Sequence, residues 1–354
     1  MSNTPSNTPA VVGILALCRI GFERECAMEI ERWLGERGAD GYVKFEKLGG
    51  QAIWIGKSPV WPKTRDLIFS RQVVKLIDKK PLYFEAKNRI SPILTALEGQ
   101  SYSAIYLDNT DTNDGNSMVD LFSQLQRPLL SAAGKANILN REAKQRAHLV
   151  FVDGTEAWLG ISEPEDTLKW PMGIPRLKMP QDAPSRSTLK LAEAFAYFMD
   201  KEEQAEWLRE GLTAVDLGAC PGGWTYQLVK HGLQVIAVDN GAMNEKIMES
   251  GLVEHIKADG FVYRPQRPVH WLVCDMVEQP SRVAKLMADW LADGDAGRAM
   301  FNLKLPMKTR LDEVELCREI IEQRLKKAGK KITRLEFRQL YHDREEVTAY
   351  LVVQ

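Results

Sequence analysis

The sequence has few cysteines and no long hydrophobic run. Its five cysteines are odd in number and form no C-x-x-C pair, so they favour neither a disulfide framework nor a zinc knuckle. We therefore expect a cytoplasmic protein without a metal site. The longest apolar run, from Ala10 to Cys18, is followed by Arg19 and falls well short of the roughly 20 residues that a membrane span needs. No membrane association is expected.

The sequence also lacks an excess of charge of either sign. Lysine and arginine number 47 against 48 aspartate and glutamate residues, which gives a formal net charge of -1 over 354 residues. Total charge therefore gives no argument for nucleic-acid binding, and any such argument must come from local patches. Residues 2–9 contain no lysine or arginine, so they do not resemble a secretory signal. We expect residues 1–10 to form a disordered tail.

Hydrophobic periodicity predicts three parts joined by a linker. Residues 11–60 read as a small α+β unit, with a strand, a helix and two short strands at Val11–Cys18, Phe22–Leu34, Tyr42–Phe45 and Ala52–Ile55. Residues 61–165 mix helices with strands, at Ile93–Leu97, Met118–Ala133, Ala104–Leu107 and His148–Val152. Five prolines between Glu163 and Ser187 disfavour regular structure, so residues 166–186 are predicted to be the linker.

Residues 187–354 show a regular alternation of strands and helices. Short apolar runs separated by helix-length segments occur at Ala214–Leu217, Val235–Val238, Val253–Ile256, Trp271–Cys274 and Met300–Leu303. This alternation predicts an α/β domain with a mostly parallel, doubly wound sheet. The last two strands, near Ile332–Phe337 and Val347–Val353, are joined by a loop too short for a parallel crossover, so a terminal antiparallel hairpin is expected in a seven-stranded sheet.

The first strand of this domain leads into a glycine turn that departs from the dinucleotide-binding pattern. Cys220 stands where G-x-G-x-x-G requires its second glycine. Asp216 at the strand end and the open turn instead suit a sulfonium amino acid, which indicates S-adenosyl-L-methionine. Asp239 and Asp259 follow the next two strands, where they can accept hydrogen bonds from a ribose and lie near an adenine. The expected cofactor-binding residues are Ser187, Asp216, Gly218, Cys220, Pro221, Gly222, Gly223, Trp224, Asp239, Asp259 and Asp275.

The end of the fourth strand bears on the atom that receives the methyl group. Its sequence, Asp275-Met-Val-Glu278, differs from the D-P-P-Y type of tetrapeptide that orients an amino nitrogen. Methylation of a pyrimidine carbon needs a thiolate nucleophile, and we interpret Cys274 as a buried small apolar residue rather than as that nucleophile. A ribose hydroxyl needs a base instead, and a lysine whose pKa falls through burial or a neighbouring cation can act as one. Lys304 follows a strand end, and Lys190 begins a helix.

Several motifs resemble those of the FtsJ-type 2'-O-ribose RNA methyltransferases. Within that group the chain is similar to the bacterial large-subunit ribosomal RNA (cytidine-2'-O)-methyltransferases with an N-terminal THUMP domain. The matching stretches are residues 17–27, 172–178, 183–191, 214–230, 273–278, 301–308 and 339–347. The resemblance implies a Rossmann-type catalytic domain, a ferredoxin-like unit, a THUMP domain, and a cytidine of the 23S rRNA peptidyl-transferase loop as target. It also implies a catalytic set of Lys190, Asp275, Lys304 and Glu346, with Lys304 as general base.

Three questions stay open at this point. Strand alternation sends only one of Glu345 and Glu346 inward, and we choose Glu346. Basic residues that precede the helix beginning near Lys190 favour RNA contact, namely Arg176, Lys178 and Arg186. A second basic stretch covers residues 324–338, and its part 324–331 is explained about equally well as a solvated helix end and turn. The alternatives to ribose methylation are a different RNA acceptor, including a base, and a non-catalytic RNA-binding or ribosome-assembly protein. A monomer is expected, since no heptad or exposed apolar repeat is present.

Overall fold

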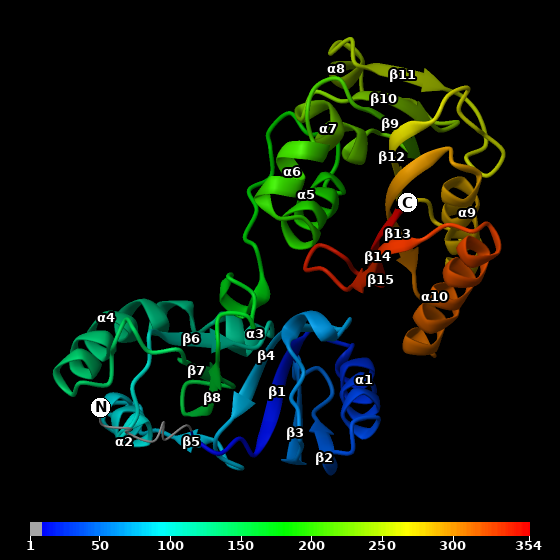
Figure 1. Ribbon diagram of the computed structural model, residues 1–354. Coiled ribbons are helices and arrows are strands. Elements are labelled where there is room, and N and C mark those ends of the chain that lie inside the picture. The colour runs from blue at the N-terminus through cyan, green and yellow to red at the C-terminus, as the bar shows by residue number, and fades with distance from the viewer. Residues whose placement is uncertain (1–8) are drawn as a thin grey trace, which may run out of the picture. The chain divides into compact units, whose positions relative to one another are not determined.

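A computed structural model describes residues 9–354, which separate into two compact units at the peptide between Ile174 and Pro175 (Figure 1). Each unit is built around its own sheet. Residues 1–8 of the predicted tail lie outside the described part. Within residues 9–354 no helix is long and apolar enough to cross a membrane.

The first unit contains one eight-stranded sheet with the order β2-β3-β1-β4-β8-β7-β6, and β5 pairs with β8. Its strands are β1 (Gly13–Cys18), β2 (Asp40–Phe45), β3 (Gln51–Lys57), β4 (Ser70–Leu76), β5 (Leu82–Tyr83), β6 (Ile105–Asn109), β7 (Arg146–Phe151) and β8 (Glu156–Ser162). Its helices are α1 (Glu23–Gly35), α2 (Ile90–Leu97), α3 (Asn113–Asn116) and α4 (Val119–Lys135), with short 3-10 turns at Thr64–Asp66 and Pro171–Gly173.

The sheet of the first unit crosses the predicted division at residue 60. Strand β4 pairs with β1 on one side and with β8 on the other. Neither β4 nor β8 was among the predicted strands. Strand β4 carries the buried polar residues Ser70, Arg71 and Gln72 and so lacks an apolar run. The side chain of Arg71 forms an ion pair with Asp111 at 2.7 Å, which compensates the charge that β4 buries.

The second unit has the predicted α/β architecture. Its seven-stranded sheet has the order β11-β10-β9-β12-β13-β15-β14. The strands are β9 (Thr213–Leu217), β10 (Gln234–Val238), β11 (Val253–Ile256), β12 (Val269–Cys274), β13 (Ala296–Lys304), β14 (Ile332–Arg338) and β15 (Glu346–Val353). Strands β9 to β13 pair with one another in parallel, and β15 runs antiparallel to both β13 and β14, which confirms the terminal hairpin.

Helices cover both faces of this second sheet. They are α5 (Thr188–Phe198), α6 (Lys201–Trp207), α7 (Gly223–Lys230), α8 (Glu245–Met248), α9 (Pro280–Asp293) and α10 (Arg310–Lys327). Figure 1 shows α5, α6 and α7 on one side of the sheet and the neighbouring α9 and α10 on the other. The carboxyl ends of parallel strands meet at one edge, which is where ligands bind in sheets of this kind. The segments after β9, β10, β11 and β12 therefore define the site.

Candidate active site

The glycine turn after β9 places Asp216 beneath the start of α7. The side chain of Asp216 is 1% exposed, and its Oδ2 accepts a hydrogen bond of 2.6 Å from the hydroxyl of Thr225. Its Oδ1 has no hydrogen-bond partner among residues 9–354. Burial, reinforced by the charges of Asp275 and Asp239, raises the pKa of Asp216 to about 7, although the bond from Thr225 acts in the opposite direction. A buried acceptor of this kind fits a ligand that carries an ammonium or sulfonium charge.

Glycines of the turn allow neighbouring segments to approach the backbone closely. Gly218 has a φ of 75°, and a Cβ atom there would lie 2.5 Å from Cγ of Met276. Gly222 has a φ of 113°, and a Cβ atom there would lie 2.6 Å from Cδ1 of Ile247. A side chain at Gly223 would collide with the hydroxyl of Ser187. Each of these positions therefore requires glycine for its backbone conformation or for its packing.

A cavity of about 410 Å³ opens beside this turn. Asp239, at one wall, accepts hydrogen bonds from the amides of Cys220 at 3.0 Å and Gly241 at 2.8 Å. These bonds fix the orientation of the carboxylate, and each oxygen keeps lone-pair capacity for a ribose hydroxyl. Asp259 is held in the same way by the amide of Phe261, at 2.9 Å. The donors and acceptors present thus fit an adenosine-bearing ligand.

The structure brings only part of the predicted cofactor set to this cavity. The predicted residues that line it are Gly218, Cys220, Asp239, Asp259 and Asp275. Pro221, Gly222 and Gly223 form the turn into α7, where Ser187 packs against Gly223. Two predicted residues, Asp216 and Trp224, do not line this cavity, and they are only 1% and 2% exposed.

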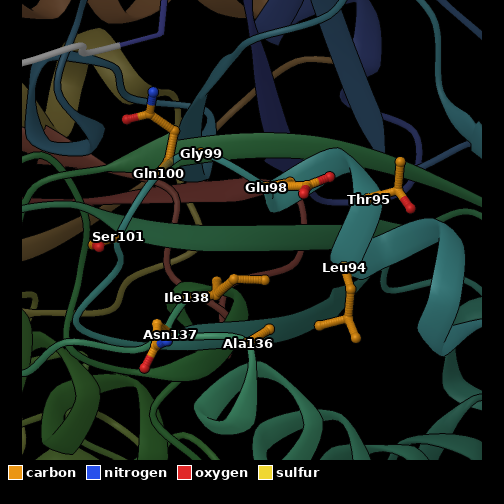
Figure 2. A pocket seen from close by; sticks show the side chains of 9 residues that line it. All are labelled: Leu94, Thr95, Glu98, Gly99, Gln100, Ser101, Ala136, Asn137 and Ile138. Carbon is orange, nitrogen blue, oxygen red and sulfur yellow. The ribbon is translucent and has the colours of Figure 1, made fainter.

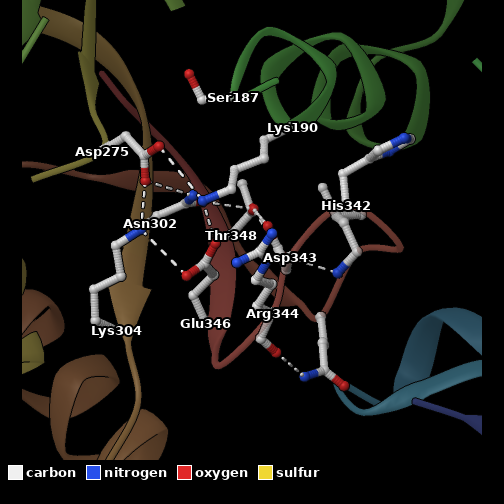
Figure 3. A network of polar contacts seen from close by, with 12 residues as sticks. Ser187, Lys190, Asp275, Asn302, Lys304, His342, Asp343, Arg344, Glu346 and Thr348 are labelled. Carbon is white, nitrogen blue, oxygen red and sulfur yellow. Dashed lines mark hydrogen bonds and ion pairs between the residues drawn. The ribbon is translucent and has the colours of Figure 1, made fainter. Parts of the chain in front are cut away.

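The four predicted catalytic residues lie together in the second unit (Figure 3). Lys304 Nζ donates to Asp275 Oδ1 at 2.6 Å and to Glu346 Oε2 at 3.2 Å. Lys190 Nζ lies 3.5 Å from Asp275 Oδ2 and forms an ion pair with Glu346 Oε1. Each carboxylate is therefore shared by both lysines, so the cluster is neutral when all four groups are charged.

Sheet register creates half of this cluster. Lys304 is the last residue of β13 and lies directly opposite Glu346, the first residue of β15. Cross-strand partners in an antiparallel pair project on the same face, so the two side chains meet. Glu346 is 7% exposed, whereas the neighbouring Glu345 is exposed and pairs with Arg310 at 2.6 Å. The geometry thus assigns the inward position to Glu346.

The expectation that the pKa of Lys304 falls is wrong for this structure. Burial favours the neutral amine, but the carboxylates of Asp275 and Glu346 outweigh it, so the pKa of Lys304 lies above its ordinary value. The second lysine does not act as an isolated cationic neighbour, since the same carboxylates contact Lys190. Lys304 is therefore an ammonium at neutral pH in the free protein.

Cys274 is not available as a nucleophile. Its side chain has no solvent exposure, which confirms the interpretation as a buried residue. Burial raises the pKa of the Cys274 thiol to about 12, so the thiol stays protonated. Cys274 therefore does not supply the thiolate that methylation of a pyrimidine carbon requires.

Sequence reasoning missed the polar residues that support the cluster of lysines and carboxylates. Asn302 Nδ2 donates to Asp275 Oδ1 at 2.9 Å, and Thr348 Oγ1 donates to Asn302 Oδ1 at 2.7 Å. Asn302 lies two residues before Lys304 on β13, so strand alternation alone could have placed its side chain on the same face. Thr348 is its cross-strand partner on β15, and this pairing is not visible without the register.

The two predicted basic stretches differ in the structure. Arg176, Lys178 and Arg186 are exposed. In the second stretch Arg324 pairs with Asp289 at 2.6 Å, and Arg334 pairs with Glu203 at 2.8 Å. These partners neutralise part of the second stretch, which weakens it as a phosphate-binding surface.

The first unit contains a cavity of its own, about 420 Å³ in volume, between the end of α2 and the segment after α4 (Figure 2). Figure 2 shows the side chains of Glu98, Gln100 and Asn137 among those that line it. No residue predicted to bind a ligand lies in this cavity.

Comparisons with known proteins cover almost the whole chain. A family model described as FtsJ-like methyltransferase matches residues 183–335. Residues 11–74 match the RlmM ferredoxin-like domain, and residues 88–163 match the N-terminal region of ribosomal RNA large subunit methyltransferase M. Proteins of that last name from Thauera aminoaromatica and Methylococcus capsulatus are 44% and 47% identical to this chain. The alignments cover 99% of both chains in the first case, and 96% of this chain and 97% of the relative in the second.

Proposed function

Since the chain belongs to the ribosomal RNA large subunit methyltransferase M family, and is thus an S-adenosylmethionine-dependent rRNA methyltransferase, we propose that it methylates the ribose 2'-hydroxyl of a cytidine in 23S rRNA. The observation that carries this choice of acceptor is the cluster of Lys190, Asp275, Lys304 and Glu346. An alcohol is a poor nucleophile until its proton is removed, and the cluster places an amine where it can accept that proton.

Another cavity of the second unit, beside Lys304, offers a place for the acceptor nucleoside. It has a volume of about 410 Å³ and is lined by Lys304 together with Glu278, Gln279, Pro306 and Glu313. Glu278 also lines the cavity beside the glycine turn. We propose that the acceptor nucleoside binds in the cavity beside Lys304 with its ribose toward this lysine, because in-line transfer requires the hydroxyl and the cofactor to be neighbours.

The catalytic residues act on the proton of the ribose hydroxyl. S-adenosylmethionine supplies an electrophilic methyl group when bound. Lys304, as the neutral amine, accepts the hydroxyl proton while the oxygen forms its bond to the methyl carbon and the bond from that carbon to sulfur breaks. Asp275 and Glu346 then stabilise the ammonium on Lys304, as they do in the free protein. Lys190 holds the far oxygens of both carboxylates.

RNA contact is assigned to the exposed residues that precede the catalytic helix. Arg176, Lys178 and Arg186 provide positive charge for phosphate contacts, which position an RNA without reading its sequence. The ferredoxin-like unit and a THUMP-like domain within the first unit would add further RNA contacts. We place the linker at residues 166–186 and the protein in the cytoplasm as a monomer.

The product of the reaction tests the proposed acceptor. Unmodified 23S rRNA is incubated with labelled S-adenosylmethionine, digested to nucleosides and analysed by mass spectrometry. We expect 2'-O-methylcytidine. A base-methylated nucleoside would refute the proposed acceptor while keeping the family assignment. Lys304→Ala should abolish transfer and leave the Kd for S-adenosylmethionine unchanged. Lys308→Ala, at an exposed position in the following loop, is the matched control.

A further inference from the structure

Asp343 is a buried carboxyl group without an assigned role. It lies in the turn between β14 and β15 and has no solvent exposure. Its Oδ2 accepts a hydrogen bond of 2.9 Å from the amide of Leu340. The hydroxyl of Thr348 lies 3.2 Å from Oδ1 and 3.0 Å from Oδ2. No cation forms an ion pair with Asp343 in the described part of the chain, so only the more distant charge of Lys190 would compensate a charge on this group.

With Asn302 donating to Asp275, the count of protons along the network makes Asp343 a donor. Asn302 uses its Nδ2 to donate to Asp275, so its Oδ1 faces Thr348 and has to accept. Thr348 has one hydroxyl proton, and the shorter contact, 2.7 Å, directs that proton to Asn302. The oxygen of Thr348 is then the acceptor in its contact with Asp343. A carboxylate has no proton to give, so this contact requires a carboxylic acid.

We propose that Asp343 is a positioning residue that is held as a neutral acid, and that its proton orients a hydrogen-bond chain through Thr348 and Asn302 to the carboxylate of Asp275 (Figure 3). The inference rests on the proposed role of Asp275 in ribose methylation. Burial is also the main cause that raises the pKa of Asp343 well above its usual range. The charges of Glu346 and Glu193 add to the rise, whereas the hydrogen bond from Leu340 and the charge of Lys190 act in the opposite direction.

The chain sets the orientation of Asp275 relative to both lysines. Asn302 and Lys304 share Oδ1 of Asp275, at 2.9 Å and 2.6 Å. Oδ2 then faces Lys190. If Asn302 turned its amide over, its oxygen would face the carboxylate and the chain would be lost. The acid on Asp343 prevents this, because it leaves the proton of Thr348 free for the oxygen of Asn302.

The turn that carries Asp343 is fixed to the catalytic helix. Glu193, on α5 one turn after Lys190, accepts hydrogen bonds from the amides of Tyr341 at 2.8 Å and His342 at 2.9 Å. His342 Nδ1 also lies 2.6 Å from Oε2 of Glu193. The helix that presents Lys190 thus also holds the turn that presents Asp343, so the acid keeps its place relative to Asp275.

Isosteric variants distinguish an acid from a carboxylate. Asn at position 343 offers one N–H donor to Thr348 and one oxygen to the amide of Leu340, as the neutral acid does. We therefore expect Asp343→Asn to keep kcat within about threefold of wild type. Asp343→Ala should lower kcat about 10-fold to 100-fold, because it removes the hydrogen bond to Thr348 that supports the carboxylate of Asp275 through Asn302. The KM for S-adenosylmethionine should not change in either variant. Equal losses in the two variants would overturn the proposal.

A second pair of variants covers the case in which Asp343→Ala does not fold. Thr348→Ser keeps the hydroxyl and should keep kcat, whereas Thr348→Val keeps the shape and should lose kcat to a similar degree as Asp343→Ala. Equal kcat values for the serine and valine variants would also refute the proposed hydrogen-bond chain from Asp343 to Asp275.

An infrared measurement separates this inference from the proposed function. In the absence of RNA, the difference spectrum of wild type minus Asp343→Asn should show the carbonyl band of a protonated carboxylic acid. A carboxylate band in this spectrum would refute the proposal. If wild type forms a base-methylated product while this acid band is present, the proposed acceptor fails and the protonation of Asp343 stands.

Discussion

The rate of methyl transfer should rise steeply with pH if the neutral amine of Lys304 accepts the ribose proton. Its ammonium donates to Asp275 at 2.6 Å and to Glu346 at 3.2 Å, and the pKa of Lys304 lies above the ordinary 10.5. At pH 7 fewer than about one molecule in 3000 then carries the neutral amine. That fraction increases about tenfold for each pH unit below the pKa, so the rate of the chemical step should increase by the same factor.

Single-turnover kinetics on unmodified 23S rRNA measure this dependence. We expect the rate to rise about 100-fold between about pH 7 and about pH 9 when the enzyme is in excess and the salt concentration is constant. Constant salt is necessary because phosphate contacts weaken as salt rises. A rate that stays level across this range would show that Lys304 is not the base and acts only as a fixed cation.

Substitution of the two neighbouring glutamates tests whether Lys304 is the titrating group. Glu346→Gln removes one of the charges that raise the pKa of Lys304, so the pH–rate profile should move to lower pH. Glu345→Gln changes an exposed carboxylate that pairs with Arg310 and should leave the profile in place. If both variants titrate as wild type does, the profile belongs to another group.

Two further predictions concern the cofactor turn. Gly218→Ala should lower Tm and weaken S-adenosylmethionine binding measured by calorimetry, because the left-handed backbone and the contact with Met276 leave no room for Cβ; unchanged Tm and Kd would contradict the packing argument. The pKa of Asp216 is about 7 in the folded protein and about 3.9 in the unfolded chain. The contribution of Asp216 to the stability of the cofactor-free protein is therefore fully present below about pH 4 and is lost as pH rises through 7. Asp216→Asn should therefore be more stable than wild type at pH 8, by up to about 4 kcal/mol, and this difference should vanish near pH 4. Denaturant unfolding at both pH values measures the difference. Equal stability of the two proteins at pH 8 would refute the free-energy cost that we assign to burying the Asp216 charge.

Apolar runs were sufficient to predict the second sheet. Every strand predicted after residue 187 is present, because parallel strands buried on both faces read as continuous hydrophobic segments. In the first unit the same criterion missed β4, whose buried Arg71 and Gln72 find polar partners in Asp111 and Leu168. Those partners lie 40 and 96 residues away in the sequence, so no local pattern could show that the strand is buried.

The acidic residues of the site were predictable for a simple geometric reason. Asp216, Asp239 and Asp275 each lie at or just after the end of a parallel strand, and such ends meet at one edge of the sheet. The supporting pair of Asn302 and Thr348 was not predictable in this way. Its contact depends on the register between β13 and β15, which no single segment of the sequence specifies.

The wrong expectation for the pKa of Lys304 shows what the arrangement of charges would do in the proposed reaction. Two adjacent lysines alone would lower each other's pKa and populate the neutral amine. Here Asp275 and Glu346 contact both ammonium groups, so the neutral form of Lys304 is rare but more basic. A stronger base gives a larger driving force for proton transfer from a weakly acidic ribose hydroxyl. In the proposed reaction, the same carboxylates that hold the proton in the free protein would therefore favour its transfer to Lys304 when the oxygen attacks the methyl group.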